Sequence, residues 1–324
     1  MSGLERYSLI LSIMRESDLN PPSLGISKNE SSGLPRKGIV LLISLSVFWG
    51  MAWPAIKISL NELPPWTFRT YCLVLSGIGI LILAKANRFK LRLPPHELRA
   101  LCLVALFNVT GWHLCSAHGV MRMHASRAVI IAFTMPLWAT VLSGVFLKER
   151  IALPRLLALA TGLIGLAFLI WPEIEAVGST PLGAVFMLGA AISWATGTVL
   201  IKRFKWNTPT TVLTGWQLLL GSIPVIIGAL VLEPFSASFT ISMGAVFALT
   251  YLIAFPMIYC HWAYFTLVRI FPASVAAIST LAIPVVGVFS SALILDETVG
   301  FSEIVALILV VSALAIVIFV EKTG

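Results

Sequence analysis

The stretch AFTMPLWATVLSGVFLKERI, residues 132–151, has a counterpart later in the same chain. Residues 273–299 read ASVAAISTLAIPVVGVFSSALILDETV, and they align with the first stretch and the residues before it at an offset of 148. The pairs matched at this offset are His113 with His261, Ala125-Ser126 with Ala273-Ser274, Pro136 with Pro284, and Glu149 with Glu297. Four shared features at one offset predict that the chain is an internal duplication.

The duplication extends to the first helix of each half. FWGMAWPAIK, residues 48–57, compares with SWATGTVLIK, residues 193–202, at an offset of 145. Trp49 then meets Trp194, and both segments end in Lys. The offsets of 145 and 148 differ by three residues, which a three-residue insertion in the second half explains. The sequence match between the halves therefore covers most of both.

The composition places the chain in a membrane. Of its 324 residues, 58% are hydrophobic and 11% are charged, whereas a soluble domain carries about 25% charged residues. The net charge of +8 is typical of basic cytoplasmic loops in a membrane protein. No basic patch is interleaved with exposed aromatic residues, so nucleic acid is not expected as a partner and the lipid bilayer is.

Ten apolar runs follow a polar segment, residues 1–35, which its composition predicts to be a disordered cytoplasmic tail. Each run approaches the roughly 20 residues that a spanning helix needs, which predicts an all-α integral membrane protein with ten transmembrane helices. The predicted spans are 38–58, 65–84, 98–117, 126–147, 153–171, 181–201, 211–232, 243–267, 273–295 and 302–320. We expect two five-helix units, residues 36–174 and 175–324.

The basic residues predict the orientation. With the N-terminus in the cytoplasm, 18 of the 22 Lys and Arg residues lie on the cytoplasmic side, as the positive-inside rule requires. The four on the other side are Lys57, Arg69, Arg122 and Arg127. Both termini are therefore expected in the cytoplasm.

Five spans per half is an odd number, so the second half enters the membrane from the opposite side. This arrangement is an inverted-topology repeat, which is common in secondary transporters that bind substrate near the midplane between the halves. The matched Pro136 and Pro284 lie near the middle of spans four and nine. Because proline lacks an N–H and disturbs the preceding turn, they are candidate hinges or cavity-lining positions, although prolines are also simply tolerated in membrane helices.

On these residues the chain resembles the EamA-type, ten-span members of the drug/metabolite transporter superfamily. The segments that carry the resemblance are FWGMAWPAIK, WTFRTYCLVLSG with Arg69, the two proline-to-acid stretches quoted above, and SWATGTVLIKRF. The resemblance implies a paired five-helix fold, a central cavity, and transport of small metabolites, often amino acids, in the inner membrane of a bacterium. It leaves the substrate, the direction and the coupling ion open, and a homodimer is one alternative for the oligomeric state.

Polar and aromatic residues inside the spans are the candidate substrate contacts. FNVTGWH, residues 107–113, and FPMIYCH, residues 255–261, each place a His two-thirds along a span. An imidazole there either faces the cavity or makes a neutral interhelical hydrogen bond. The full candidate set is Trp49, Trp53, Asn108, Trp112, His113, Thr134, Trp194, Tyr259, His261 and Thr280. A pocket lined by such aromatic side chains favours an amphipathic or aromatic solute.

Several chemistries have no counterpart in the sequence. No carboxylate lies near the middle of a span. Proton coupling through an embedded acid and catalysis by paired carboxylates therefore both lack candidate residues. No His or Cys cluster has metal-ligand spacing, and no G-x-x-x-x-G-K-[ST] motif is present. We expect no catalytic residue, metal, cofactor or ATP hydrolysis. The alternative to a transporter is a membrane-embedded enzyme that acts on a lipid-linked group.

Overall fold

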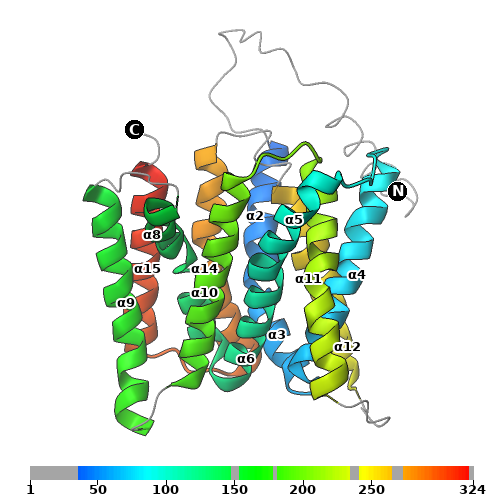
Figure 1. Cartoon of the computed structure of the whole chain (residues 1–324). Coiled ribbons are helices and arrows are strands. Elements are labelled where there is room, and N and C mark those ends of the chain that lie inside the picture. The colour runs from blue at the N-terminus through cyan, green and yellow to red at the C-terminus, as the bar shows by residue number, and fades with distance from the viewer. Residues whose placement is uncertain (1–35, 147–152, 178–180, 234–240, 265–272, 321–324) are drawn as a thin grey trace.

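The computed structural model describes residues 36–146, 153–177, 181–233, 241–264 and 273–320, and every regular element in these ranges is helical. Figure 1 shows that the helices run side by side between the two ends of one bundle. The first helix begins and the last helix ends at the same end of the bundle (Figure 1). The chain is therefore an all-helical protein across the part that the structure describes.

The helices of the N-terminal part follow the predicted spans closely. Several predicted spans are divided into shorter helical elements, and these divisions are where the polar residues gather. The elements are α2 (Arg36–Gly50), α3 (Ala52–Leu60), α4 (Pro65–Ala86), α5 (Pro95–Ala105), η1 (Leu106–Gly111), α6 (Trp112–Arg122), α7 (Ala125–Ala132), α8 (Met135–Phe146) and α9 (Leu153–Val177).

The C-terminal part has fewer divisions. Its elements are α10 (Leu182–Arg203), α11 (Thr210–Leu232), α12 (Met243–Leu252), η2 (Ile253–Tyr259), α14 (Ala273–Leu295) and α15 (Phe301–Val320). The labels η1 and η2 mark π-helices, in which the backbone makes i→i+5 hydrogen bonds instead of i→i+4.

Seven segments in the described ranges are long and apolar enough to cross a bilayer. They are Gly38–Leu60, Pro65–Ala86, Pro95–Arg122, Ala125–Phe146, Leu182–Arg203, Thr210–Leu232 and Met243–Tyr264. Three shorter apolar helices accompany them: Leu156–Trp171, Ala282–Leu295 and Phe301–Ile316. These lengths and compositions make the chain a multi-pass membrane protein.

Prolines divide two of the spans. Pro54 follows the turn at Met51 between α2 and α3, and Pro136 follows the turn between α7 and α8. A proline cannot donate to the carbonyl one turn earlier, and its ring crowds that turn. By contrast, α14 continues through Pro284 without a break, so the matched prolines have different effects on their helices.

The two parts of the chain pack closely through glycine. Helices α4 and α11 lie against each other, and a Cβ on Gly77 would lie 3.3 Å from the carbonyl oxygen of Gly215. The converse distance, from a Cβ on Gly215 to the Gly77 oxygen, is 3.4 Å. Small residues allow this backbone approach, which a membrane interior favours because helix association there depends on close packing.

Candidate functional site

Two π-helical segments occupy matching positions in the two halves of the chain. The segment η1 lies between α5 and α6, and the segment η2 follows α12. The repeat offset of 148 places residues 106–111 on residues 254–259, which lie inside η2. The segments η1 and η2 contain most of the two polar sequence stretches FNVTGWH and FPMIYCH. Because π-helical turns are rare and are frequent at functional sites, this pair of segments is the candidate site.

Each π-helix offers a carbonyl to a helix from the other half. The Ser193 hydroxyl, on α10, donates to the Phe107 carbonyl at 2.8 Å. The Trp49 indole Nε1–H, on α2, donates to the Pro256 carbonyl at 2.9 Å. The Phe107 carbonyl also accepts from the Trp112 amide within the helix, so the Ser193 hydroxyl is a second donor to it, which the two lone pairs of a carbonyl oxygen allow. The first helix of each half therefore fixes the π-helix of the other half.

His113 follows η1 in the first turn of α6 and is 8% exposed. Its carbonyl accepts hydrogen bonds from Arg69 Nε at 3.0 Å and from the Ser116 hydroxyl at 3.2 Å. Its ring Nδ1 is buried and has no hydrogen-bond partner in the part of the chain that the structure describes. The backbone of His113 is thus anchored, while its imidazole retains an unused polar atom.

His261 repeats this arrangement after η2. The Pro256 and Met257 carbonyls lie close to the ring, but no residue in the described ranges meets Nδ1 in hydrogen-bonding geometry. The Trp49 ring packs edge-to-face on His261, with centroids 5.9 Å apart. His113 and His261 are near enough for charges on the two rings to interact. The structure therefore brings the matched histidines into one region.

Asn108 contributes a third unused polar atom, from inside η1. The residue is 6% exposed, and its Oδ1 has no hydrogen-bond partner among the residues that the structure describes. Its neighbour Thr110 is satisfied, because the hydroxyl donates to the Gly221 carbonyl at 2.7 Å. Buried polar atoms without partners are uncommon and costly, and each calls for an explanation such as a ligand or a bound water.

The aromatic candidates lie in two groups. Trp112 and Trp194 pack together with ring centroids 5.1 Å apart, and Trp49 packs on His261. Tyr259 lies outside both pairs and exchanges a hydrogen bond with the Ser44 hydroxyl at 2.8 Å. Trp53 is 6% exposed and belongs to the hydrophobic core. Trp49, Trp112, Trp194 and Tyr259 are all partly exposed.

Thr134 and Pro136 lie at the break between α7 and α8. The Thr134 hydroxyl donates to the Ile131 carbonyl at 2.6 Å and accepts from the Trp138 indole at 3.2 Å. It therefore satisfies the interrupted backbone locally. The side chain of Thr280 lies outside the described residues, so the structure gives no placement for that candidate.

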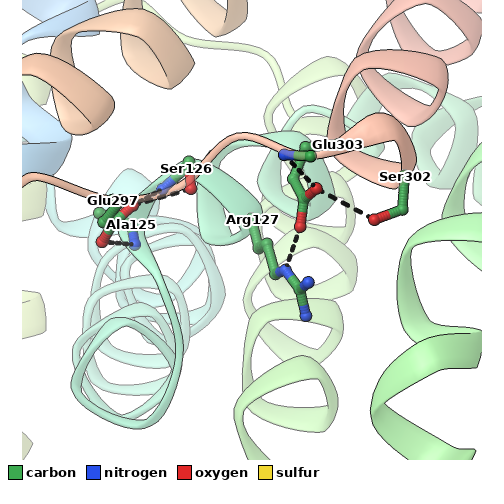
Figure 2. Close-up of polar contacts among 7 residues, drawn as sticks. Ala125, Ser126, Arg127, Glu297, Ser302 and Glu303 are labelled. Carbon is green, nitrogen blue, oxygen red and sulfur yellow. Dashed lines mark hydrogen bonds and ion pairs between the residues drawn. The ribbon is translucent and has the colours of Figure 1, made fainter.

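Carboxylates connect the halves at the helix ends. Figure 2 shows Glu297 against the start of α7, where it accepts from the amides of Ala125 at 2.7 Å and Ser126 at 2.9 Å. It also accepts from the Ser126 hydroxyl. In the same figure Arg127 pairs with Glu303 at 2.5 Å. Glu297 therefore caps a helix N-terminus, where negative charge is stabilising, as expected for a structural acid.

Three further carboxylates reach across the halves in the same way. Glu233 accepts from the amides of Trp66 and Thr67 at the start of α4, and Glu97 accepts from the Asn207 amide before α11. Glu62 accepts from the hydroxyl and amide of Ser242 at the start of α12. These two bonds hold the pKa of Glu62 below its ordinary value of 4.5.

Two features of the site were not predicted from the sequence. The π-helices leave no periodic signal, although Pro256, within η2, could have indicated a disturbed helix. Arg69 was assigned to the non-cytoplasmic side, within the predicted span 65–84, but its burial was not predicted: it is 3% exposed near the start of α4. In the described ranges, no group of three or more His, Cys, Asp or Glu side chains could hold a metal ion.

Comparisons with known proteins show the family to which the chain belongs. The EamA-like transporter family matches the chain twice, over residues 36–171 and 181–319. The uncharacterized transporter YvbV of Bacillus subtilis is 30% identical over 292 residues, which covers 88% of this chain and 92% of that protein. A probable amino-acid metabolite efflux pump of Salmonella typhimurium is 27% identical over 299 residues, covering 88% of this chain and 96% of the relative.

A solved crystal structure has the same fold at low sequence similarity. The TM-score is 0.63 at 16% identity, and the match covers 90% of this chain and 99% of the other. The relatives are named as transporters or efflux pumps, and the helices described above cross a bilayer several times. The chain is a multi-pass membrane protein and belongs to the EamA-like transporter family of the drug/metabolite transporter superfamily.

Proposed function

We propose that this protein is a secondary transporter that exports small metabolites, most of all amino acids or related amphipathic solutes. It works by alternating access around a site between the two π-helices, in a ten-span bundle of two inverted five-helix repeats. The matched positions of η1 and η2 carry this proposal. A related efflux pump whose printed name refers to amino-acid metabolites supports the substrate class and the direction.

The local chemistry supports solute binding at these segments. Asn108, His113 and His261 each retain a buried polar atom that no described residue satisfies, and a solute with hydrogen-bonding groups would complete them. Trp49, Trp112 and Trp194 supply apolar ring surface, which suits an amphipathic solute. The two halves meet through helix-end carboxylates, whose bonds can break and re-form as the halves rock.

The proposed setting is the cytoplasmic membrane of a bacterium, with both termini in the cytoplasm. Cysteine labelling of whole cells at Asn87 and at Asn61 tests this orientation, because the proposal places these positions on opposite sides of the membrane. Asn61 should react with an impermeant reagent and Asn87 should not. The reverse pattern would contradict the orientation without affecting the transport proposal.

Transport itself is tested with purified protein in sealed liposomes. Radiolabelled amino acids should cross the bilayer with saturable kinetics and emerge unchanged. Chemical conversion of a lipid-linked substrate without solute movement would instead favour the alternative, a membrane-embedded enzyme. Flux equal to that of protein-free liposomes for all solutes offered would refute the proposal.

A further inference from the structure

Arg69 has no counter-ion among the described residues. It lies near the start of α4, is 3% exposed, and no described carboxylate comes within ion-pair distance of it. Two other basic side chains have partners: Arg127 pairs with Glu303, and Lys57 donates to the Val120 and Met123 carbonyls at the end of α6. A buried cation without a partner is costly, and in a membrane protein it marks a functional site.

Two of the N–H groups of the Arg69 guanidinium donate hydrogen bonds that hold it in place. Nε donates to the His113 carbonyl at 3.0 Å, and one N–H of Nη2 donates to the Ser116 hydroxyl at 2.9 Å. The Phe68 ring lies 4.8 Å from Cζ, which adds a cation–π contact. Because a guanidinium carries five N–H groups, three remain without an acceptor among the described residues.

These free donors belong to the site already described. Arg69 donates to the backbone carbonyl of His113, whose buried ring Nδ1 also has no hydrogen-bond partner within the described ranges. His113 lies close enough to Arg69 and His261 for their charges to interact. The region therefore presents several N–H donors and a positive charge and, among the described residues, no anion.

We propose that Arg69 binds the carboxylate of the transported solute, so that the protein selects carboxylate-bearing substrates. A carboxylate only accepts hydrogen bonds and matches the fork of a guanidinium with two parallel bonds. The His113 carbonyl and the Ser116 hydroxyl fix the direction in which the remaining N–H groups point. The carboxamide of an amino-acid amide carries no charge there and donates from its nitrogen, so it fits the N–H donors of Arg69 poorly. This inference rests on the proposed transport function and refines it.

The test compares acids with their amides on the full-length protein in detergent. Thermal stability is measured against L-amino acids with neutral side chains, each paired with its amide, such as L-phenylalanine and L-phenylalaninamide. A ligand that binds the folded state raises the melting temperature with concentration. The wild-type protein should bind at least one acid about 10-fold or more tightly than the matching amide. Equal binding of acids and amides, or no response to any acid, would overturn the proposal.

Variants show whether Arg69 is responsible. Arg69→Gln should weaken binding of the acid by about 10- to 100-fold, the loss expected for a charge-assisted pair, and leave the amide unchanged. Arg69→Lys keeps the charge and should retain part of the preference. The control, Arg122→Gln, removes a charge from an exposed residue on α6 and should leave it intact. An acid-to-amide ratio that survives Arg69→Gln would overturn the assignment.

Two outcomes separate this inference from the proposed function. If solutes without a carboxylate cross the liposome membrane while no acid binds, transport stands and the role of Arg69 falls. If no solute crosses at all, the proposed function falls. Where Arg69→Gln yields no folded protein, the wild-type acid-to-amide ratio and Arg69→Lys still decide the question.

Discussion

Replacing Gly197 by Ala would place a methyl group against the Asn108 side chain. A Cβ built on Gly197 lies 2.5 Å from Cγ and 2.9 Å from Cβ of Asn108. Rotating the Asn108 side chain about its Cα–Cβ bond moves Cγ away but leaves Cβ where the backbone puts it. The clash is therefore relieved only if α10 and η1 move apart, which disturbs the candidate site.

A second glycine on the same helix provides a matched control. A Cβ on Gly189 meets only the Cys115 sulfur, at 3.6 Å, which is an ordinary contact distance. Both substitutions gain about 1 kcal/mol of helix propensity, and this gain cancels when the two variants are compared. Overpacking costs about 1–3 kcal/mol, so Gly197→Ala should be less stable than Gly189→Ala by about that amount.

The assay is the free energy of unfolding of each variant, measured by titrating sodium dodecyl sulfate into mixed micelles. Transport of the same preparations is measured in liposomes, where Gly197→Ala should be slower and Gly189→Ala should match the wild type. Equal unfolding free energies for the two variants would refute the close contact between α10 and η1. Equal transport rates would refute its importance for the site.

Three other perturbations have defined outcomes. Glu297→Gln should lower the free energy of unfolding by about 1–2 kcal/mol, because a neutral group replaces the half-exposed charged acceptor of three hydrogen bonds. The control is Asp296→Asn at the neighbouring residue, which has a φ of 52° that Asn tolerates. This control should change the free energy of unfolding little. Because the pKa of Glu62 is lowered in the folded state, its ionised carboxylate stabilises the fold fully at pH values above its unfolded pKa. This contribution is lost as the pH falls through the folded pKa. The difference in melting temperature between the wild type and Glu62→Gln should therefore shrink below about pH 4.5. A constant difference from pH 7 to pH 3 would contradict that linkage. His113→Ala should reduce transport while the protein still folds, and an unchanged rate would remove His113 from the site.

The helices could be predicted from the sequence because hydrophobic length decides them in a membrane. The run from residue 211 to residue 232 became α11 at Thr210–Leu232, for example. What apolar length does not report is a local break. The turn before Pro54 was missed because the flanking residues are apolar on both sides, and Pro284 was expected to disturb a helix that runs through it unbroken.

The candidate site was predicted in part. The histidines and Asn108 attracted attention because polar groups in hydrocarbon are costly, and the repeat offset paired His113 with His261. The π-helical turns depend on which carbonyls find partners across the bundle, such as Pro256 with the Trp49 indole, and a single segment of sequence does not contain that information. The burial of Arg69 was not predicted for the same reason, since it depends on how α4 packs on α6.

The central claim is that this chain moves a solute between its two halves without altering it. Counterflow in sealed liposomes measures this most directly: vesicles loaded with an unlabelled amino acid are diluted into the same amino acid in labelled form. Label should accumulate transiently inside the vesicles, and this accumulation should saturate with concentration and be reduced by His113→Ala. Accumulation no greater than in protein-free vesicles, across amino acids and other amphipathic solutes, would contradict it.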